Sequence, residues 1–245
     1  MMVAVFSLSG APGVTTLSLA LASTWPAPGM ARVVEADASG GDVAAWWRLA
    51  PWPGVVDLAA ASRSGQDHET LDLGSFSQVL PGGLRVCVAP PTAERTTGAV
   101  GVLAHNPKAL TETVVDLGRV APSTPSASLL EAADVAVLVT TGDVAHLKRV
   151  KESAPGLRSR CAHVGVAVVG ADRSAAEISG AVGLPVWARV PHDPRTAAFL
   201  WGQGEVRRVN RRPLITAART LAHALEEQGR TESSSSASAL AAEVP

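Results

Sequence analysis

The sequence predicts an α/β fold in which a mostly parallel β-sheet is covered by helices on both faces. Short, continuously apolar segments alternate with helical segments along the chain, which is the pattern of βαβ units with buried strands. Hydrophobic residues make up 47% of the chain and charged residues 18%, a composition that suits a sheet buried on both faces. At 245 residues the chain can bury one large core. We therefore expect a single α/β domain.

Seven apolar segments are the predicted strands. They span residues 2–8, 31–36, 84–90, 112–117, 134–141, 163–170 and 185–191. The stretch FSQVLPGGLRVCV adds a turn at residues 81–83, which favours an antiparallel hairpin at one edge of the sheet. We expect a mostly parallel sheet of about seven or eight strands.

Segments between these strands are the predicted helices. Residues 15–25, 143–152 and 174–182 read as helices, and a last helix over 212–228 carries a continuous apolar face that we expect to dock on the sheet. Beyond it, residues 229–245 are rich in serine and alanine and have little apolar periodicity. We expect a domain over 1–228 and a disordered tail over 229–245.

Composition argues against several classes of site. Cys87 and Cys161 lie in or beside apolar segments, which favours buried free thiols and a cytoplasmic protein. The six histidines have no spacing typical of a zinc site. No apolar stretch reaches the roughly 18 residues of a membrane span, and the first residues lack the charged lead of a signal peptide. A net charge of −1 gives no overall attraction to nucleic acid.

The stretch SGAPGVTT, residues 9–16, is a candidate phosphate-binding loop. It follows the first strand and opens into a helix, where free backbone N–H groups and the helix dipole attract an anion without any side chain. Gly10 and Gly13 permit a tight backbone, Thr15 can offer its hydroxyl to a magnesium ion, and Thr16 can bond the α-phosphate.

Val14 occupies the position at which a GxxxxGK[ST] loop has its lysine. Losing a charge-assisted hydrogen bond costs about 1.5 to 3 kcal/mol in phosphate binding. Losing a contact that strengthens in the transition state costs about 10² to 10³ in rate. Nucleotide binding is therefore expected to survive the substitution better than hydrolysis.

The loop resembles KGGxGKTT, the deviant phosphate loop of the MinD/ParA family of P-loop ATPases. The corresponding residues here are Ser9, Gly10, Ala11, Pro12, Gly13, Val14, Thr15 and Thr16. Both family lysines are missing, since serine and valine stand at their positions. The resemblance continues through VVEADASGGD, TVVDLGR and GLPVWARVPHDPRTAAFLWGQG. It implies a single-domain P-loop NTPase-type sandwich, and lysine-deficient loops are distantly similar to those of CpaE/TadZ-like members.

The resemblance also implies site residues and a cofactor. ATP or ADP with Mg²⁺ would bind the loop, and Pro191 and Asp193 would lie near the adenine. Thr15, Asp37 and Asp116 would hold the metal directly or through water, with Asp37 also orienting the attacking water, and so catalytic, if the chain is an active ATPase. Carboxylates that end parallel strands do meet at one edge of the sheet. The alternative is that both acids are ordinary strand-end residues that cap helices.

Two further features suggest partners. Consecutive Trp46 and Trp47 cannot both face one core, which leaves room for one to be exposed. The pair is either a packed helix edge or a contact for a protein partner or a membrane surface. The basic cluster is either a solvated rim or, by resemblance to ParA-like proteins, a non-specific DNA contact. Its members are Arg207, Arg208, Arg211 and Arg212. The chain ends without a basic amphipathic helix, which argues against direct membrane insertion.

Three functions remain open at the level of sequence. The first is a nucleotide-binding protein with impaired or absent hydrolysis that acts as a homodimer and positions partners in chromosome or plasmid partition, cell division, or pilus and secretion machinery. The second is a slow partitioning ATPase in which Arg32, Lys148 or Arg189 replaces the lost lysines. The third is a nucleotide-free scaffold.

Overall fold

An eight-stranded sheet forms the centre of the protein in the computed structural model, which describes residues 1–10, 12–27, 29, 31–64 and 71–242. The strand order is β3-β4-β2-β5-β1-β6-β7-β8, and every pairing is parallel except that of β3 with β4. The strands are β1 (Met2–Ser7), β2 (Arg32–Glu35), β3 (Gln78–Val79), β4 (Arg85–Cys87), β5 (Thr113–Arg119), β6 (Val135–Thr141), β7 (Val164–Val169) and β8 (Val186–Val190). The predicted strands and the antiparallel edge hairpin are confirmed.

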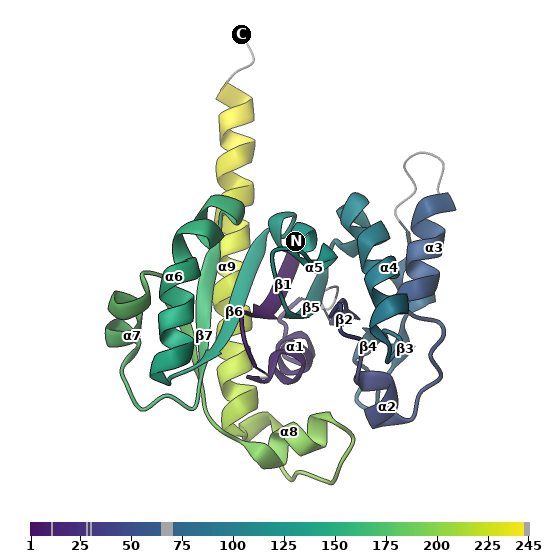
Figure 1. Ribbon diagram of the computed structural model, residues 1–245, viewed down its shortest axis with the longest axis horizontal. Coiled ribbons are helices and arrows are strands. Elements are labelled where there is room, and N and C mark those ends of the chain that lie inside the picture. Colours follow the sequence, from purple (N-terminus) through teal and green to yellow (C-terminus); the bar gives the residue numbers. More distant parts are fainter. Residues whose placement is uncertain (11, 28, 30, 65–70, 243–245) are drawn as a thin grey trace.

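Helices cover both faces of this sheet (Figure 1). They are α1 (Val14–Ser23), α2 (Val43–Trp47), α3 (Val55–Ser64), α4 (Ala93–His105), α5 (Pro125–Glu131), α6 (Val144–Arg160), α7 (Ala175–Val182), α8 (Pro194–Leu200) and α9 (Pro213–Ala242). Short 3-10 turns span Leu73–Phe76, Pro107–Leu110 and Val209–Arg211. One core lies under α3 to α7 and the other under α1, α2, α8 and α9.

Strand β1 shows why the strands read as continuously apolar. Ala4 and Phe6 point into the core under α3 to α7, whereas Val3 and Val5 point into the core under α1 and α9. Because successive side chains alternate between the two faces, both sets must be apolar when both faces are covered.

The central position of β1 assembles the candidate site. Strand β1 pairs with β5 on one side and β6 on the other, and Glu35 of β2 pairs in register with Asp116 of β5. Since these strands are parallel, the loops that follow β1, β2, β5 and β6 meet at one edge of the sheet.

The last helix is longer than the sequence predicts. Its apolar face is buried as expected, with Leu214, Ile215, Ala218, Leu221, Ala222 and Leu225 in the core. The backbone stays helical to Ala242, however, and its last turns extend beyond the sheet (Figure 1), which differs from the disordered tail expected over 229–245. Extending a packed helix costs far less than nucleating one, and alanine and glutamate favour it. The domain boundary at 228 stays a prediction, and 243–245 lie outside the described residues.

Both cysteines are free and buried, as predicted. In the described part of the chain, no helix combines the length and the apolar character needed to cross a membrane.

Candidate functional site

The loop between β1 and α1 leaves the start of α1 open to a ligand. Gly13 caps the helix with a left-handed φ of 94°, and no side chain caps it by a hydrogen bond. Gly10 also has a positive φ of 64°, a conformation that glycine adopts without strain. The first N–H groups of a helix have no intrahelical acceptor. They therefore remain available to an anion, although Ala11 lies outside the described residues.

Val14 does not fill the mouth of the loop. Its side chain is 6% exposed and packs into the core beneath α1. The loop therefore has an apolar core residue at the position where a GxxxxGK[ST] loop has its lysine.

Thr15 and Asp116 are joined across the sheet edge. Asp116 is 1% exposed, accepts a hydrogen bond from the Gly118 amide at 3.0 Å and shares a side-chain hydrogen bond with Thr15. Burial, aided by the nearby Asp37 and Asp42 charges, raises the pKa of Asp116 from 3.8 to about 7, although the bonds from Thr15 and Gly118 favour the carboxylate.

Asp37 lies against the same backbone. A Cβ atom placed on Gly118 would be 1.8 Å from Asp37 Oδ2, so the Asp37 carboxylate occupies the space that this glycine leaves. The structure thus brings Thr15, Asp37 and Asp116 together. Two carboxylates beside a hydroxyl are hard oxygen ligands of the kind that hold Mg²⁺, usually together with waters and phosphates. Among the described residues no group of three or more His, Cys, Asp or Glu side chains forms a complete metal cage.

Glu35 accepts hydrogen bonds from backbone amides. Its Oε1 accepts hydrogen bonds from the amides of Asp42 at 2.9 Å and Val43 at 3.0 Å, and its Oε2 accepts one from Ala89 at 2.9 Å. Burial raises the pKa of Glu35 from 4.5 to about 7 against the effect of these donors. Glu35 therefore ties β2, the start of α2 and the end of β4 together.

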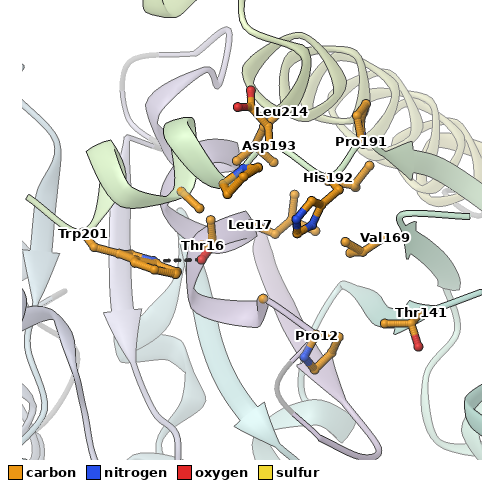
Figure 2. A pocket seen from close by; sticks show the side chains of 14 residues that line it. Pro12, Thr16, Leu17, Thr141, Val169, Pro191, His192, Asp193, Trp201 and Leu214 are labelled. Carbon is orange, nitrogen blue, oxygen red and sulfur yellow. Dashed lines mark hydrogen bonds between the residues drawn. The ribbon is translucent and has the colours of Figure 1, made fainter. Parts of the chain in front are cut away.

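A cavity of about 330 Å³ opens beside the loop (Figure 2). Pro12, Gly13 and Thr16 line it from the loop, and Pro191 and Asp193 line it from the segment after β8. Further wall residues are Leu17, Thr141, Val169, Val190, His192, Pro194, Ala197, Trp201 and Leu214. The size is that of a small-molecule site, and the mostly apolar lining suits a flat ring better than a charged group.

Trp201 and Thr16 connect the far wall of the cavity to the loop. Trp201 Nε1 donates a hydrogen bond to Thr16 Oγ1 at 3.0 Å (Figure 2). Because this bond uses an acceptor lone pair, the Thr16 hydroxyl proton stays free to donate. Sequence reasoning missed Trp201, whose only signal was its place eight residues after Asp193 in a stretch already selected.

The Asp193 carboxylate is already engaged. It accepts hydrogen bonds from the Thr196 amide at 3.3 Å and the Thr196 hydroxyl at 2.7 Å, and it forms an ion pair with Arg212. Burial opposes its ionisation, but the bonds from Arg212 and Thr196 outweigh burial and hold its pKa below 3.8. Asp193 thus caps α8 and shapes the cavity wall.

Arg212 differs from the other arginines of the basic cluster. Its Nε also donates to Thr196 Oγ1 at 3.0 Å, whereas Arg207, Arg208 and Arg211 are exposed. Arg212 is therefore held by Asp193 and Thr196 within the fold.

Trp46 and Trp47 pack against α8 and the residue that ends it. Neither Trp46 nor Trp47 is exposed: the rings of Trp46 and Trp201 lie 5.4 Å apart, and Trp47 Nε1 donates to the Leu200 carbonyl at 3.1 Å. Both side chains are half-buried because α8 and the turn after it pack over α2, and a partner contact at this place stays a prediction. Trp52 is the exposed one, at 67%.

The three cations considered as replacements for the lost lysines also have places. Arg32 begins β2 and so lies at the amino edge of the sheet, away from the loop. Arg189 donates to the Ala171 carbonyl at 2.7 Å, and Lys148 is exposed on α6. None of these positions supplies an observed contact with the loop in the described structure.

Comparison with known proteins identifies the fold. No protein-family model matches the sequence, and no curated protein matches it. A ParA family ATPase from Chlorobium tepidum superposes with a TM-score of 0.71 at 19% identity, over 90% of this chain and 98% of that one. The cell division ATPase MinD from Pyrococcus furiosus gives 0.69 at 17% identity over 93% and 98%. MinD from Pyrococcus horikoshii, solved with Mg-ADP, gives 0.67 at 16% identity over 93% and 96%. The chain has the fold of the ParA and MinD ATPases.

Proposed function

We propose that this protein binds ATP or ADP with Mg²⁺ at the loop of residues 9–16, with impaired or absent hydrolysis. The observation that carries the proposal is the joined Thr15 and Asp116 with Asp37 beside them, at the uncapped start of α1. The neighbouring loop residues line a cavity. The Mg-ADP in the Pyrococcus horikoshii MinD structure supports the choice of ligand.

Each part of the site has a role in this proposal. The free amides of α1 bind phosphate oxygens, the apolar cavity beside Pro191 receives the base, and Thr15, Asp37 and Asp116 hold Mg²⁺ directly or through water. A bound Mg²⁺ would offset the negative charge of the two carboxylates and the phosphates. The raised pKa of Asp116 is consistent with a carboxylate whose charge lacks a cationic partner.

Weak hydrolysis follows from the loop's side chains. Val14 is buried in the core and Ser9 carries no charge, so the loop itself supplies no cation as negative charge develops on a transferring phosphoryl group. The backbone amides still contribute to nucleotide affinity, so the missing cations are expected to lower the rate of hydrolysis more than the affinity.

We further propose that nucleotide shifts a monomer–dimer equilibrium and that the dimer positions a partner. The neighbours named as a cell division ATPase and a plasmid partition protein support this class of role. A ligand shifts such an equilibrium only if it binds the dimer more tightly than the monomer. Sedimentation with and without Mg·ATP tests this part.

Calorimetry with Mg·ATP and Mg·ADP tests the binding proposal. We expect heat of binding that Thr15→Val reduces and that Ser23→Ala, at the other end of α1, leaves unchanged. No heat at millimolar nucleotide would overturn nucleotide binding and favour the nucleotide-free scaffold.

A slow ATPase is the second candidate, and the position of Asp37 beside Asp116 favours it. Turnover that Asp37→Ala abolishes would establish it, whereas turnover unchanged by that substitution would indicate contamination.

A further inference from the structure

Strand order brings a histidine to the candidate phosphate loop. Because β6 pairs directly with β1, the segment that follows β6 and begins α6 lies next to the loop that follows β1. A Cβ atom placed on Gly10 would be 3.4 Å from His146 Nε2. The Nε2 edge of the ring therefore faces the loop backbone at Gly10.

Asp143 holds this histidine in place. Asp143 caps α6 and accepts a hydrogen bond from the His146 amide at 3.1 Å, and its other oxygen is bonded to His146 Nδ1 and to the Thr141 hydroxyl. The Thr141 hydroxyl and then the His146 amide lower the pKa of Asp143 to about 2, so Asp143 is a carboxylate at neutral pH. A carboxylate acceptor at Nδ1 keeps the proton on that nitrogen and fixes the ring.

The charges around the loop favour a side chain that can donate hydrogen bonds and carry positive charge. Asp37 and Asp116 are acidic, and the loop positions Ser9 and Val14 carry no cation. A polyphosphate brought to this place adds more negative charge. His146 is partly accessible, with 28% of its side chain exposed, so Nε2 can reach a ligand, and Thr141 of the same cluster also lines the cavity.

We propose that His146, oriented by Asp143, is a phosphate-binding residue of this site: with Nδ1 bonded to Asp143, the ring protonated on both nitrogens donates from Nε2 to an oxygen of a nucleoside polyphosphate held over Gly10. In its imidazolium form it supplies positive charge that the loop lacks. This inference rests on the proposed nucleotide binding.

The test compares affinities of full-length variants by calorimetry, with Mg·ATP and inorganic tripolyphosphate as probes. We expect His146→Ala to weaken both by about tenfold or more, the effect of losing a charge-assisted hydrogen bond. His146→Lys should retain affinity. His105→Ala, at the exposed end of α4, is the matched control and should change neither affinity. Equal losses for both probes assign the contact to phosphate and not to the base.

Failures of the two proposals are distinguishable. If the wild-type protein binds neither probe, nucleotide binding and this inference both fall. If it binds them and His146→Ala binds equally well, only the inference falls. Should His146→Ala fail to fold, His146→Gln, which keeps a donor without the charge, carries the same comparison. A lysine variant as weak as the alanine variant would contradict the charge role.

Discussion

Replacing Arg212 with alanine is expected to destabilise the protein strongly, because it leaves the buried Asp193 carboxylate without its cationic partner. The Asp193 side chain is 2% exposed and that of Arg212 31%. Arg212 supplies two donors, Nη2 to Asp193 and Nε to the Thr196 hydroxyl at 3.0 Å. Removing one partner of a buried pair costs about 3 to 5 kcal/mol. Since Arg212 is partly exposed and Thr196 still serves Asp193, we expect about 2 to 3 kcal/mol.

Urea unfolding at pH 7 measures this loss. Arg211→Ala, the exposed neighbour, is the control and should change the free energy of unfolding by less than about 0.5 kcal/mol. The free energy of unfolding of Arg212→Lys should lie between those of the wild type and Arg212→Ala, because an ammonium cannot reproduce the two-donor fork of guanidinium. The folded pKa of Asp193 lies below 3.8, so its ionisation stabilises the fold above that pH and the gain is lost as pH falls through the folded value. The difference between Arg212→Ala and wild type should therefore shrink below about pH 3.8. A loss at pH 7 no larger than that of Arg211→Ala would refute the reasoning.

Three other substitutions test the site. Burial raises the pKa of Asp116 from 3.8 to about 7. As pH rises the unfolded chain therefore loses this proton first, and the free energy of unfolding should fall between pH 3.8 and pH 7 by up to about 1.4 kcal/mol per pH unit. Asp116→Asn should reduce that slope in denaturation measured across this pH range, and an unchanged slope would contradict the raised pKa of Asp116. Val14→Lys should raise Mg·ATP affinity about tenfold to a hundredfold in calorimetry, because the lysine stem can follow the buried Val14 position and carry its ammonium to the loop. No gain would argue that a side chain at position 14 does not reach the bound phosphate. Gly118→Ala should lower the free energy of unfolding in urea by about 2 kcal/mol or more, because the φ of Gly118 is +57° and the added Cβ would meet Asp37. The control Gly98→Ala, which has open space around it in α4, should be neutral or stabilising. Equal effects of the two substitutions would refute the packing argument.

The fold was predictable because its signals are local. Each strand is a short apolar run, as in VAVFS, and the glycines near the start of α1 mark a loop without any knowledge of its surroundings. The length of α9 was not predictable from the serine-rich composition after 228. Continuation of a helix depends on the packed helix that precedes it as well as on its own residues.

The candidate site was likewise predictable only in part. The resemblance to the MinD/ParA family selected Thr15, Asp37 and Asp116, and the structure places them together. The roles of Asp193 and Arg212 were not visible, because an ion pair across 19 positions leaves no periodic trace.

The sequence by itself determined the order of strands and helices, the glycine-rich loop and the absence of both lysines, since each is a property of neighbouring residues. Tertiary structure alone decided that Val14 turns into the core, that Arg212 is committed to Asp193, that α8 covers both tryptophans of α2, and that His146 faces Gly10. These contacts join segments distant in the chain, and the register and order of a parallel sheet, not local propensity, set which of them meet.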